Sequence, residues 1–173
     1  MSVYIEKAYL ADAQAITNLV NMAYRPEAGR QGWTHEIGLV SGARITVEQV
    51  AALLDSRSTI LVMRNDDRIL ACVQIEPSDN QSCYISMLAT APEAQGNGIG
   101  KQMLAAAESL AVAEYSACVF KMSVLSPRQE LLAYYKRRGY VLSGYSEHYP
   151  VAAEVGIPMI AGLQLLGLEK QRT

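Results

Sequence analysis

The pattern of apolar and polar positions starts with an alternating stretch, residues 2–10, which predicts an opening strand. Apolar residues then recur at helical spacing from Asp12, whose carboxylate suits an N-cap, to Ala23. A second helix is predicted to open with a capping box, in which Thr46 is followed three positions later by Gln49. The chain therefore begins as a strand and two helices.

Residues 24–45, between the two helices, follow neither the helical nor the strand period. The segment contains four glycines, one proline and the only tryptophan of the chain. Long irregular segments inside a small domain often carry function. The pattern therefore predicts a functional loop here.

Strand alternation returns over residues 59–77, which predict two strands joined by a turn at 65–67. Residues 82–90 predict a further strand. An amphipathic helix is predicted to start from Gly98, and its spacing places Glu108 on the outward face.

The C-terminal third is predicted to contain a strand over 116–126, a helix closed by Gly139, and two last strands over 140–146 and 162–170. The resulting order, β-α-α-β-β-β-α-β-α-β-β, predicts an α/β fold with a mixed sheet and helices on its faces.

The composition indicates one ordinary globular domain. Of 173 residues, 50% are hydrophobic and 18% are charged, and the formal net charge is −2. The length suits a single domain, and no linker or repeat divides residues 1–173. A slightly acidic chain does not offer a general nucleic-acid surface, and no apolar run approaches the ~18 residues of a membrane span. We expect neither nucleic acid nor membrane as a partner.

The cysteines favour reduced thiols over a metal site. Cys72, Cys83 and Cys118 are odd in number and lack CxxC spacing, and two histidines do not complete a zinc set. We expect buried thiols and no metal. The N-terminus also lacks the basic start and apolar core of a signal peptide, so a cytoplasmic location is expected.

Three glycines in five positions, Gly96, Gly98 and Gly100, lead into the helix after residue 98. A P-loop would need a glycine and a hydroxyl where the chain has Gln95 and Gln102, and a dinucleotide fingerprint would need G-x-G-x-x-G after a βαβ opening. Both are excluded. A strand, a glycine turn and a helix start instead form an anion site that suits a pyrophosphate. A tight turn packed against other backbone is the alternative.

Two motifs resemble the GNAT superfamily of N-acetyltransferases. Residues 95–100, QGNGIG, match its Q/R-x-x-G-x-G/A signature. Residues 130–141, ELLAYYKRRGYV, are similar to its second landmark, a helix that ends in Tyr135 and is followed by Gly139 and Tyr140. The element order agrees as well, so the resemblance covers nearly the whole chain. It implies a mostly antiparallel sheet of about six to seven strands flanked by about four helices.

The resemblance also implies acetyl-CoA as co-substrate, held between two splayed central strands, with an amine attacking its thioester directly. The pyrophosphate contacts that it implies come from Gln95, Gly96, Asn97, Gly98, Ile99, Gly100 and Lys101. The pantetheine and acetyl contacts that it implies come from the backbone of Leu88, Ala89 and Thr90, at groups left free where the strands part.

Tyr135 is the expected general acid, because a phenol is protonated at neutral pH and can donate to the departing thiolate. A packing role between helix and sheet is the alternative. Tyr134, one residue away, is expected to face elsewhere. Arg128 stands where many relatives carry an asparagine that touches the cofactor. It either reaches a phosphate of the cofactor or pairs with Glu130 or solvent.

The general base is less well marked. Glu36 in the long loop and Glu76 at the end of a strand are candidates, with His148 as an alternative. Both carboxylates also suit an ordinary surface position. None of the three belongs to a motif.

The segment 24–45 corresponds in position to the substrate loop of the superfamily. Arginines there suit an acceptor carboxylate, as in an amino acid or a small metabolite. Trp33 either contacts the acceptor or anchors the loop to the core. Residues considered for acceptor contacts are Arg25, Arg30, Trp33, Arg44 and Glu76.

The sequence therefore predicts an N-acetyltransferase that moves an acetyl group to a primary amine, with a small or amino-acid-like acceptor favoured over a protein or peptide. A non-catalytic acyl-CoA-binding sensor or scaffold is the alternative. Dimers are common in the superfamily, so the resemblance also admits a homodimer.

Overall fold

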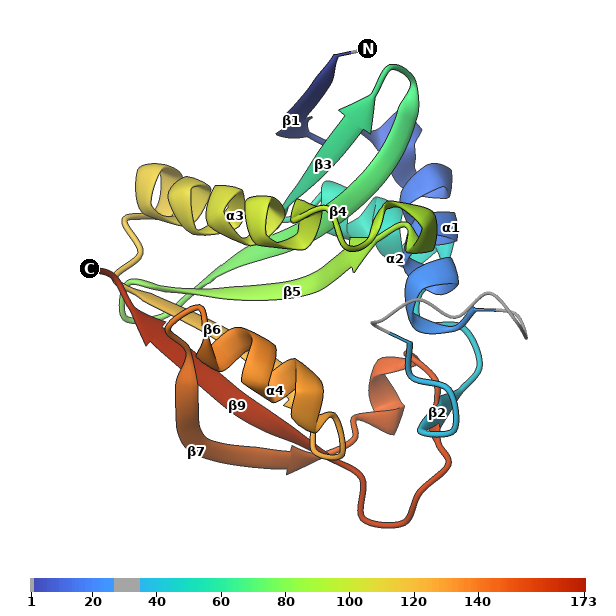
Figure 1. The fold of residues 1–173 in the computed structure, drawn as a ribbon, viewed down its shortest axis with the longest axis vertical. Helices are drawn as coiled ribbons and strands as arrows, with labels where there is room; N and C mark the ends of the chain where they lie inside the picture. The colour runs from blue at the N-terminus through green and yellow to red at the C-terminus, as the bar shows by residue number, and fades with distance from the viewer. Residues whose placement is uncertain (1, 27–34) are drawn as a thin grey trace.

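A computed structural model describes residues 2–26 and 35–173 (Figure 1). Within these residues, seven strands form one sheet in the order β1-β3-β4-β5-β6-β9-β7. Only β5 and β6 pair in parallel, and the other neighbours are antiparallel. The strands are β1 (Val3–Lys7), β3 (Thr59–Asn65), β4 (Arg68–Ser78), β5 (Ser82–Thr90), β6 (Val119–Leu125), β7 (Val141–His148) and β9 (Gln164–Gln171). The predicted mixed, mostly antiparallel sheet is confirmed.

Four α-helices cover the two faces of the sheet in the described ranges. They are α1 (Ala13–Tyr24), α2 (Val47–Leu54), α3 (Ile99–Tyr115) and α4 (Gln129–Lys136). Alternate residues of β3 show the division, because Ile60 and Val62 pack with α1 and α2, whereas Leu61 and Met63 pack with α3 and α4. The sheet thus has a buried core on each face.

Short elements complete the chain. Three 3-10 turns occupy Leu10–Asp12, Pro92–Ala94 and Val151–Ala153. A small second sheet pairs β2 (Val40–Ser41) with β8 (Ile157–Pro158). This sheet was not predicted, since each strand has only two residues and its partner lies far along the chain.

Several local predictions are confirmed and others are wrong in detail. Thr46 and Gln49 form the predicted capping box of α2. Asp12 stands at the N-cap of α1, but its carboxylate accepts from the Tyr9 amide and from Arg64 instead of from the helix. Cys118 is exposed, unlike the two other cysteines, because it lies just before β6 at the surface.

Glu108 corrects the outward face that was predicted for α3. Its carboxylate accepts a hydrogen bond from the Tyr140 hydroxyl at 2.8 Å and forms an ion pair with Lys170 at 2.8 Å. The prediction assumed that a carboxylate on a helix faces solvent. Helical spacing contains no information on Lys170, which β9 places beside Glu108.

The feature that positions the site is the divergence of β5 and β6. They pair only over residues 82–84 and 119–121, and beyond that point they diverge, while β5 stays paired with β4 and β6 with β9, as Figure 1 shows. A bulge lies at the same place, since Met87 and Leu88 stand opposite the single residue Val73 of β4. Met87 has a φ of 55°, a left-handed conformation that is uncommon outside glycine. The central strands are therefore splayed, as the resemblance implied.

Candidate active site

Two cavities meet where β5 and β6 diverge. The first, here called the loop groove, has a volume of about 360 Å³ and lies between residues 95–101 and α4. The second, here called the polar cavity, has a volume of about 370 Å³ and lies beyond the splayed strands. Only Leu88, Leu131 and Tyr135 line both among the described residues. These three residues mark the junction of the cavities.

The glycine loop takes its shape from backbone conformation. Gly96 and Gly98 have φ values of +85° and +73°, and a Cβ at either position would meet no atom within 4 Å. Left-handed backbone, and not close packing, therefore requires glycine at these two positions. A Cβ at Gly100 would instead lie 3.2 Å from the Tyr134 hydroxyl. The turn packed against backbone, the alternative from the sequence, is not what the structure shows.

The loop leads into the N-terminus of α3, which no side chain caps. The first-turn N–H groups of a helix have no partners within the helix, and they carry the positive end of its dipole. Gly98, Ile99, Gly100 and Lys101 all line the groove at this end of α3. The groove thus places backbone donors and one lysine around a site that suits a phosphate group.

The other predicted loop contacts divide into two groups. Gln95 and Gly96 line the groove, and the Gln95 amide donates to the Thr90 carbonyl at 3.1 Å. Asn97 lies outside the groove lining and donates to the Ala94 carbonyl at 3.4 Å. Ala89 lines neither cavity, because its position in the ladder pairs it with Cys72 of β4.

Leu88 and Thr90 direct their backbone groups into the gap. The Ala91 amide bonds to the Leu70 carbonyl, on the β4 side, so alternate residues of β5 point to the opposite edge. The resemblance implied free backbone groups at these two residues, but both carbonyls have hydrogen-bond partners. The Leu88 oxygen accepts from the Tyr24 hydroxyl at 2.7 Å, and the Thr90 oxygen accepts from Gln95. The expectation of free carbonyls did not include the side chains of Tyr24 and Gln95, which lie outside β5.

Tyr135 stands at the junction of the two cavities. It is 8% exposed, and its ring packs edge-on against Tyr134 and Tyr140, with centroids 5.3 and 6.0 Å apart. Burial raises the pKa of its phenol well above the ordinary value. Its hydroxyl has no hydrogen-bond partner within the described residues. The side chain therefore combines the predicted packing with a protonated hydroxyl beside both cavities.

Tyr134 does not face away from the site, as was expected. It lines the loop groove, and the Arg138 guanidinium lies 3.4 Å from its ring centroid. Tyr134 and Tyr135 are neighbours in α4 and point in different directions, yet both line the groove. Tyr134 meets the glycine loop, whereas Tyr135 meets the junction.

Glu36 forms part of the wall of the polar cavity. Its carboxylate pairs with Arg25 at 2.7 Å, and both side chains are nearly buried. Burial raises the pKa of Glu36, and the positive charges of Arg25, Arg44 and Arg128 oppose this rise. The carboxyl thus stays more basic than an exposed one, while the ion pair favours its charged form.

Arg128 also belongs to the polar cavity and not to the loop groove. Its guanidinium bonds Glu130 at 2.6 Å and the His35 carbonyl at 2.7 Å. Of the two alternatives from the sequence, the structure shows the pair with Glu130. Arg128 thereby ties the start of α4 to the segment that carries Glu36.

Comparison with protein families decides the class of the chain. A model described as the acetyltransferase (GNAT) family matches residues 15–140. The chain belongs to the GNAT family. It is therefore an acetyl-CoA-dependent N-acetyltransferase by class. A search of curated proteins finds no match.

Solved structures agree with this GNAT protein in fold. The PaiA N-acetyltransferase from Thermoplasma acidophilum in complex with coenzyme A has a TM-score of 0.75 at 14% identity, with 99% of this chain and 100% of that chain covered. The ribosomal-protein-alanine N-acetyltransferase from Brucella melitensis has a TM-score of 0.73 at 19% identity, with coverage of 98% and 99%. A GNAT family acetyltransferase from Elizabethkingia anophelis with acetyl-CoA bound has a TM-score of 0.70 at 15% identity, with 98% of each chain covered.

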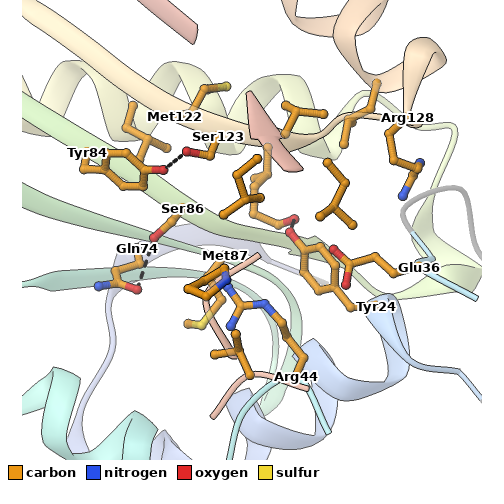
Figure 2. A pocket seen from close by; sticks show the side chains of 18 of the residues that line it. Tyr24, Glu36, Arg44, Gln74, Tyr84, Ser86, Met87, Met122, Ser123 and Arg128 are labelled. Carbon is orange, nitrogen blue, oxygen red and sulfur yellow. Dashed lines mark hydrogen bonds between the residues drawn. The ribbon is translucent and has the colours of Figure 1, made fainter. Parts of the chain in front are cut away.

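The polar cavity of this GNAT protein contains residues that sequence reasoning did not place in the site. Figure 2 shows Tyr24, Gln74 with Ser86, and Tyr84 with Ser123 around it. Their hydrogen bonds join different strands, so no local pattern identifies them. Arg44 lines the cavity as well, and the sequence had named it only as one of several loop arginines.

The remaining candidates are placed as follows. Glu76 is exposed and lines the polar cavity. His148 lies outside that cavity, in a separate surface hollow, which does not favour it as a base. Arg30 and Trp33 lie outside the described residues. In residues 2–26 and 35–173, no group of three or more His, Cys, Asp or Glu is arranged to hold a metal, and no helix is long and apolar enough to cross a membrane.

Proposed function

We propose that this GNAT protein transfers the acetyl group of acetyl-CoA to the primary amine of a small acceptor by direct attack in a ternary complex. The observation that carries the proposal is the junction of the two cavities at Tyr135. The loop groove fits the cofactor, because it combines an uncapped helix N-terminus with Lys101. The polar cavity is within the size range of small-molecule sites and holds the acceptor.

Acetyl-CoA supplies an activated thioester. In the proposed arrangement, residues 95–101 hold its pyrophosphate, and the edge of β5 at Leu88 and Thr90 aligns its pantetheine arm and acetyl group. Backbone N–H groups at that edge are suited to stabilise the negative charge that develops on the carbonyl oxygen. Leu88 lines both cavities, so this edge presents the acetyl group to an amine in the polar cavity.

Tyr135 donates a proton to the departing sulfur. Its raised pKa keeps the phenol protonated at neutral pH, as a donor must be. A thiolate formed in the same buried junction also binds a proton more tightly than in water, since burial disfavours its charge. Burial therefore raises the pKa of both the phenol and the leaving thiol, so the phenol can still donate a hydrogen bond to the departing sulfur.

Glu36 accepts the proton that the acceptor's ammonium group must lose to become the attacking amine, directly or through water. Burial makes this carboxyl more basic, which suits a general base, and Arg25 holds it in place. Arg128 bonds the backbone of the neighbouring residue, His35, and so fixes the segment from the side of α4.

The test measures release of the CoA thiol from acetyl-CoA with a panel of amines, amino acids and peptides. Tyr135→Phe is expected to lower kcat by about 10²- to 10⁴-fold, the usual contribution of general acid catalysis, with little change in acetyl-CoA affinity. Unchanged turnover would contradict the role of Tyr135. Binding of acetyl-CoA without amine-dependent release across the panel would instead support a non-catalytic sensor or scaffold.

A further inference from the structure

Three arginines line or border the polar cavity, and two of them are paired. Arg25 pairs with Glu36 at 2.7 Å, and Arg128 pairs with Glu130 at 2.6 Å. Arg44 forms no ion pair or hydrogen bond through its guanidinium with any described residue. A half-buried cation without an anion is costly, so a cavity that keeps one there is suited to an anion from outside.

The backbone of Arg44 is held in place. Its amide donates to the Asn21 side chain at 2.8 Å, and the same oxygen accepts from the amide of Ile45. These bonds anchor the arginine to α1. The guanidinium lies 5.8 Å from the Tyr24 ring centroid and points into the cavity beside Met87, as Figure 2 shows. The charge is therefore aimed at the cavity from a fixed base.

The charge of Arg44 acts across the whole cavity. Burial raises the pKa values of Tyr24, Tyr84 and Tyr149, and the guanidinium of Arg44 opposes the rise at each of them. These tyrosines come from α1, from β5 and from the segment after β7. A ligand anywhere between them lies within the field of this one arginine.

Tyr24 connects Arg44 to the reaction centre. Its ring faces the guanidinium, and its hydroxyl bonds the Leu88 carbonyl at 2.7 Å. An anionic group bound at Arg44 is thus separated from the splayed edge of β5 by one tyrosine side chain. That spacing suits a small acceptor whose amine and acid group are a few bonds apart.

The other free charges of the lining are negative. Glu76 and Glu147 are exposed carboxylates of the same cavity, and neither has a cationic partner within 4.0 Å among the described residues. Within the described ranges, one cation and two carboxylates without ion-pair partners complement a molecule that carries both signs. An ammonium group is attracted to one side and an acid group to Arg44.

We propose that Arg44 binds the carboxylate of the acceptor, so that the acceptor is a free amino acid or an amino-acid-like amine. This inference rests on the proposed acetyl transfer and names its substrate class. Arg44 is a specificity residue, and it takes no part in proton transfer. A planar guanidinium matches a carboxylate with two parallel hydrogen bonds, which a lysine does not reproduce.

The experiment uses matched acceptor pairs at a fixed acetyl-CoA concentration. A panel of L-amino acids is compared with the primary amides of the same amino acids and with aminoalkylphosphonic acids, by initial rates of CoA release. The proteins are the wild type, Arg44→Lys, Arg44→Met and Arg172→Met. The last variant removes one positive charge at an exposed position that lines neither cavity.

The wild type and Arg172→Met are expected to favour at least one amino acid over its amide by about 10- to 100-fold in kcat/KM, the range for hydrogen bonds to a charged group. Arg44→Met should reduce that ratio to near one through KM for the acid, and Arg44→Lys should retain part of it. KM for acetyl-CoA should stay the same in every variant.

Other outcomes separate the two proposals. Acetylation of amides as fast as acids, or an acid preference that survives in Arg44→Met, would overturn the inference and leave the proposed function intact. Faster turnover of phosphonic acids than of carboxylic acids would overturn the choice of a carboxylate. No release with any amine, despite acetyl-CoA binding, would contradict the proposed function itself.

Discussion

Adding a methyl group at Gly100 tests whether the loop groove holds acetyl-CoA. Gly100 lies in the first turn of α3, with ordinary helical backbone, so alanine is tolerated there. Its Cβ would lie 3.2 Å from the Tyr134 hydroxyl and 3.9 Å from the Thr90 hydroxyl. All three residues line the groove, so the methyl group takes space from the ligand and leaves the core unchanged.

The expected magnitudes have opposite signs for folding and for binding. Alanine in a helix is more favourable than glycine by up to about 1 kcal/mol, which offsets the small shift required of Tyr134. The Tm of Gly100→Ala should therefore stay within about 2 °C of the wild type. The signature that residues 95–100 match accepts alanine at position 100, so the methyl group alone should cost no more than about 1 kcal/mol and raise Kd for acetyl-CoA by about 5-fold or less. The larger side chain of Gly100→Val should cost about 1 to 3 kcal/mol and raise Kd about 5- to 150-fold.

Gly162→Ala is the matched control. Gly162 has a φ of +71°, no atom within 4 Å of the added Cβ, and a position outside the groove. Left-handed alanine costs about 1 to 2 kcal/mol, so its Tm should fall by about 2 to 8 °C without a change in Kd. Calorimetric titration with acetyl-CoA and thermal melting measure both quantities. Wild-type affinity in Gly100→Val would refute the placement of the cofactor in this groove.

Two further predictions concern the buried polar groups. Tyr140→Phe removes a hydrogen bond to the Glu108 carboxylate but leaves the ion pair of Glu108 with Lys170. We therefore expect the free energy of unfolding to fall by about 1.5 kcal/mol and the Tm by about 3 to 6 °C. A Tm within about 1 °C of the wild type would contradict this expectation. Burial raises the pKa of Glu36 in the folded state above its unfolded value, so the folded state binds this proton more tightly. The free energy of unfolding should therefore fall as pH rises between the two values, and Glu36→Gln should remove that slope in urea denaturation between about pH 4 and pH 7. A difference between the two proteins that does not vary with pH would argue against it.

Elements with local causes could be predicted from the sequence. The Thr46 capping box, the β3–β4 turn and the strand that leads into the glycine loop all follow from residues within a few positions of one another. The conformation of Gly96 and Gly98 belongs to this group, because left-handed backbone strongly favours glycine whatever surrounds it. The resemblance of the second motif predicted that Tyr135 lies near the end of a helix, and α4 ends one residue later, at Lys136.

Contacts between distant segments could not be predicted. The Tyr24 hydroxyl reaches the Leu88 carbonyl across 64 positions, and Lys170 reaches Glu108 across 62. Helical spacing predicted that Glu108 faces solvent because a carboxylate is normally exposed, but Lys170 of β9 and Tyr140 supply its partners. Arg128 shows both cases, since its pair with Glu130 is two residues away, whereas its bond to the His35 carbonyl spans 93.

The sequence by itself determined the glycine loop at the start of α3 and carried the two motifs that indicate the family, since backbone conformation and helix ends depend on short stretches of chain. The tertiary structure decided how the charges around the polar cavity are paired. It joined Arg25 to Glu36 and Arg128 to Glu130, and it left Arg44 facing the cavity. Charge pairing depends on the separation of side chains in space, and that separation exists only once the strands, helices and long loop have packed together.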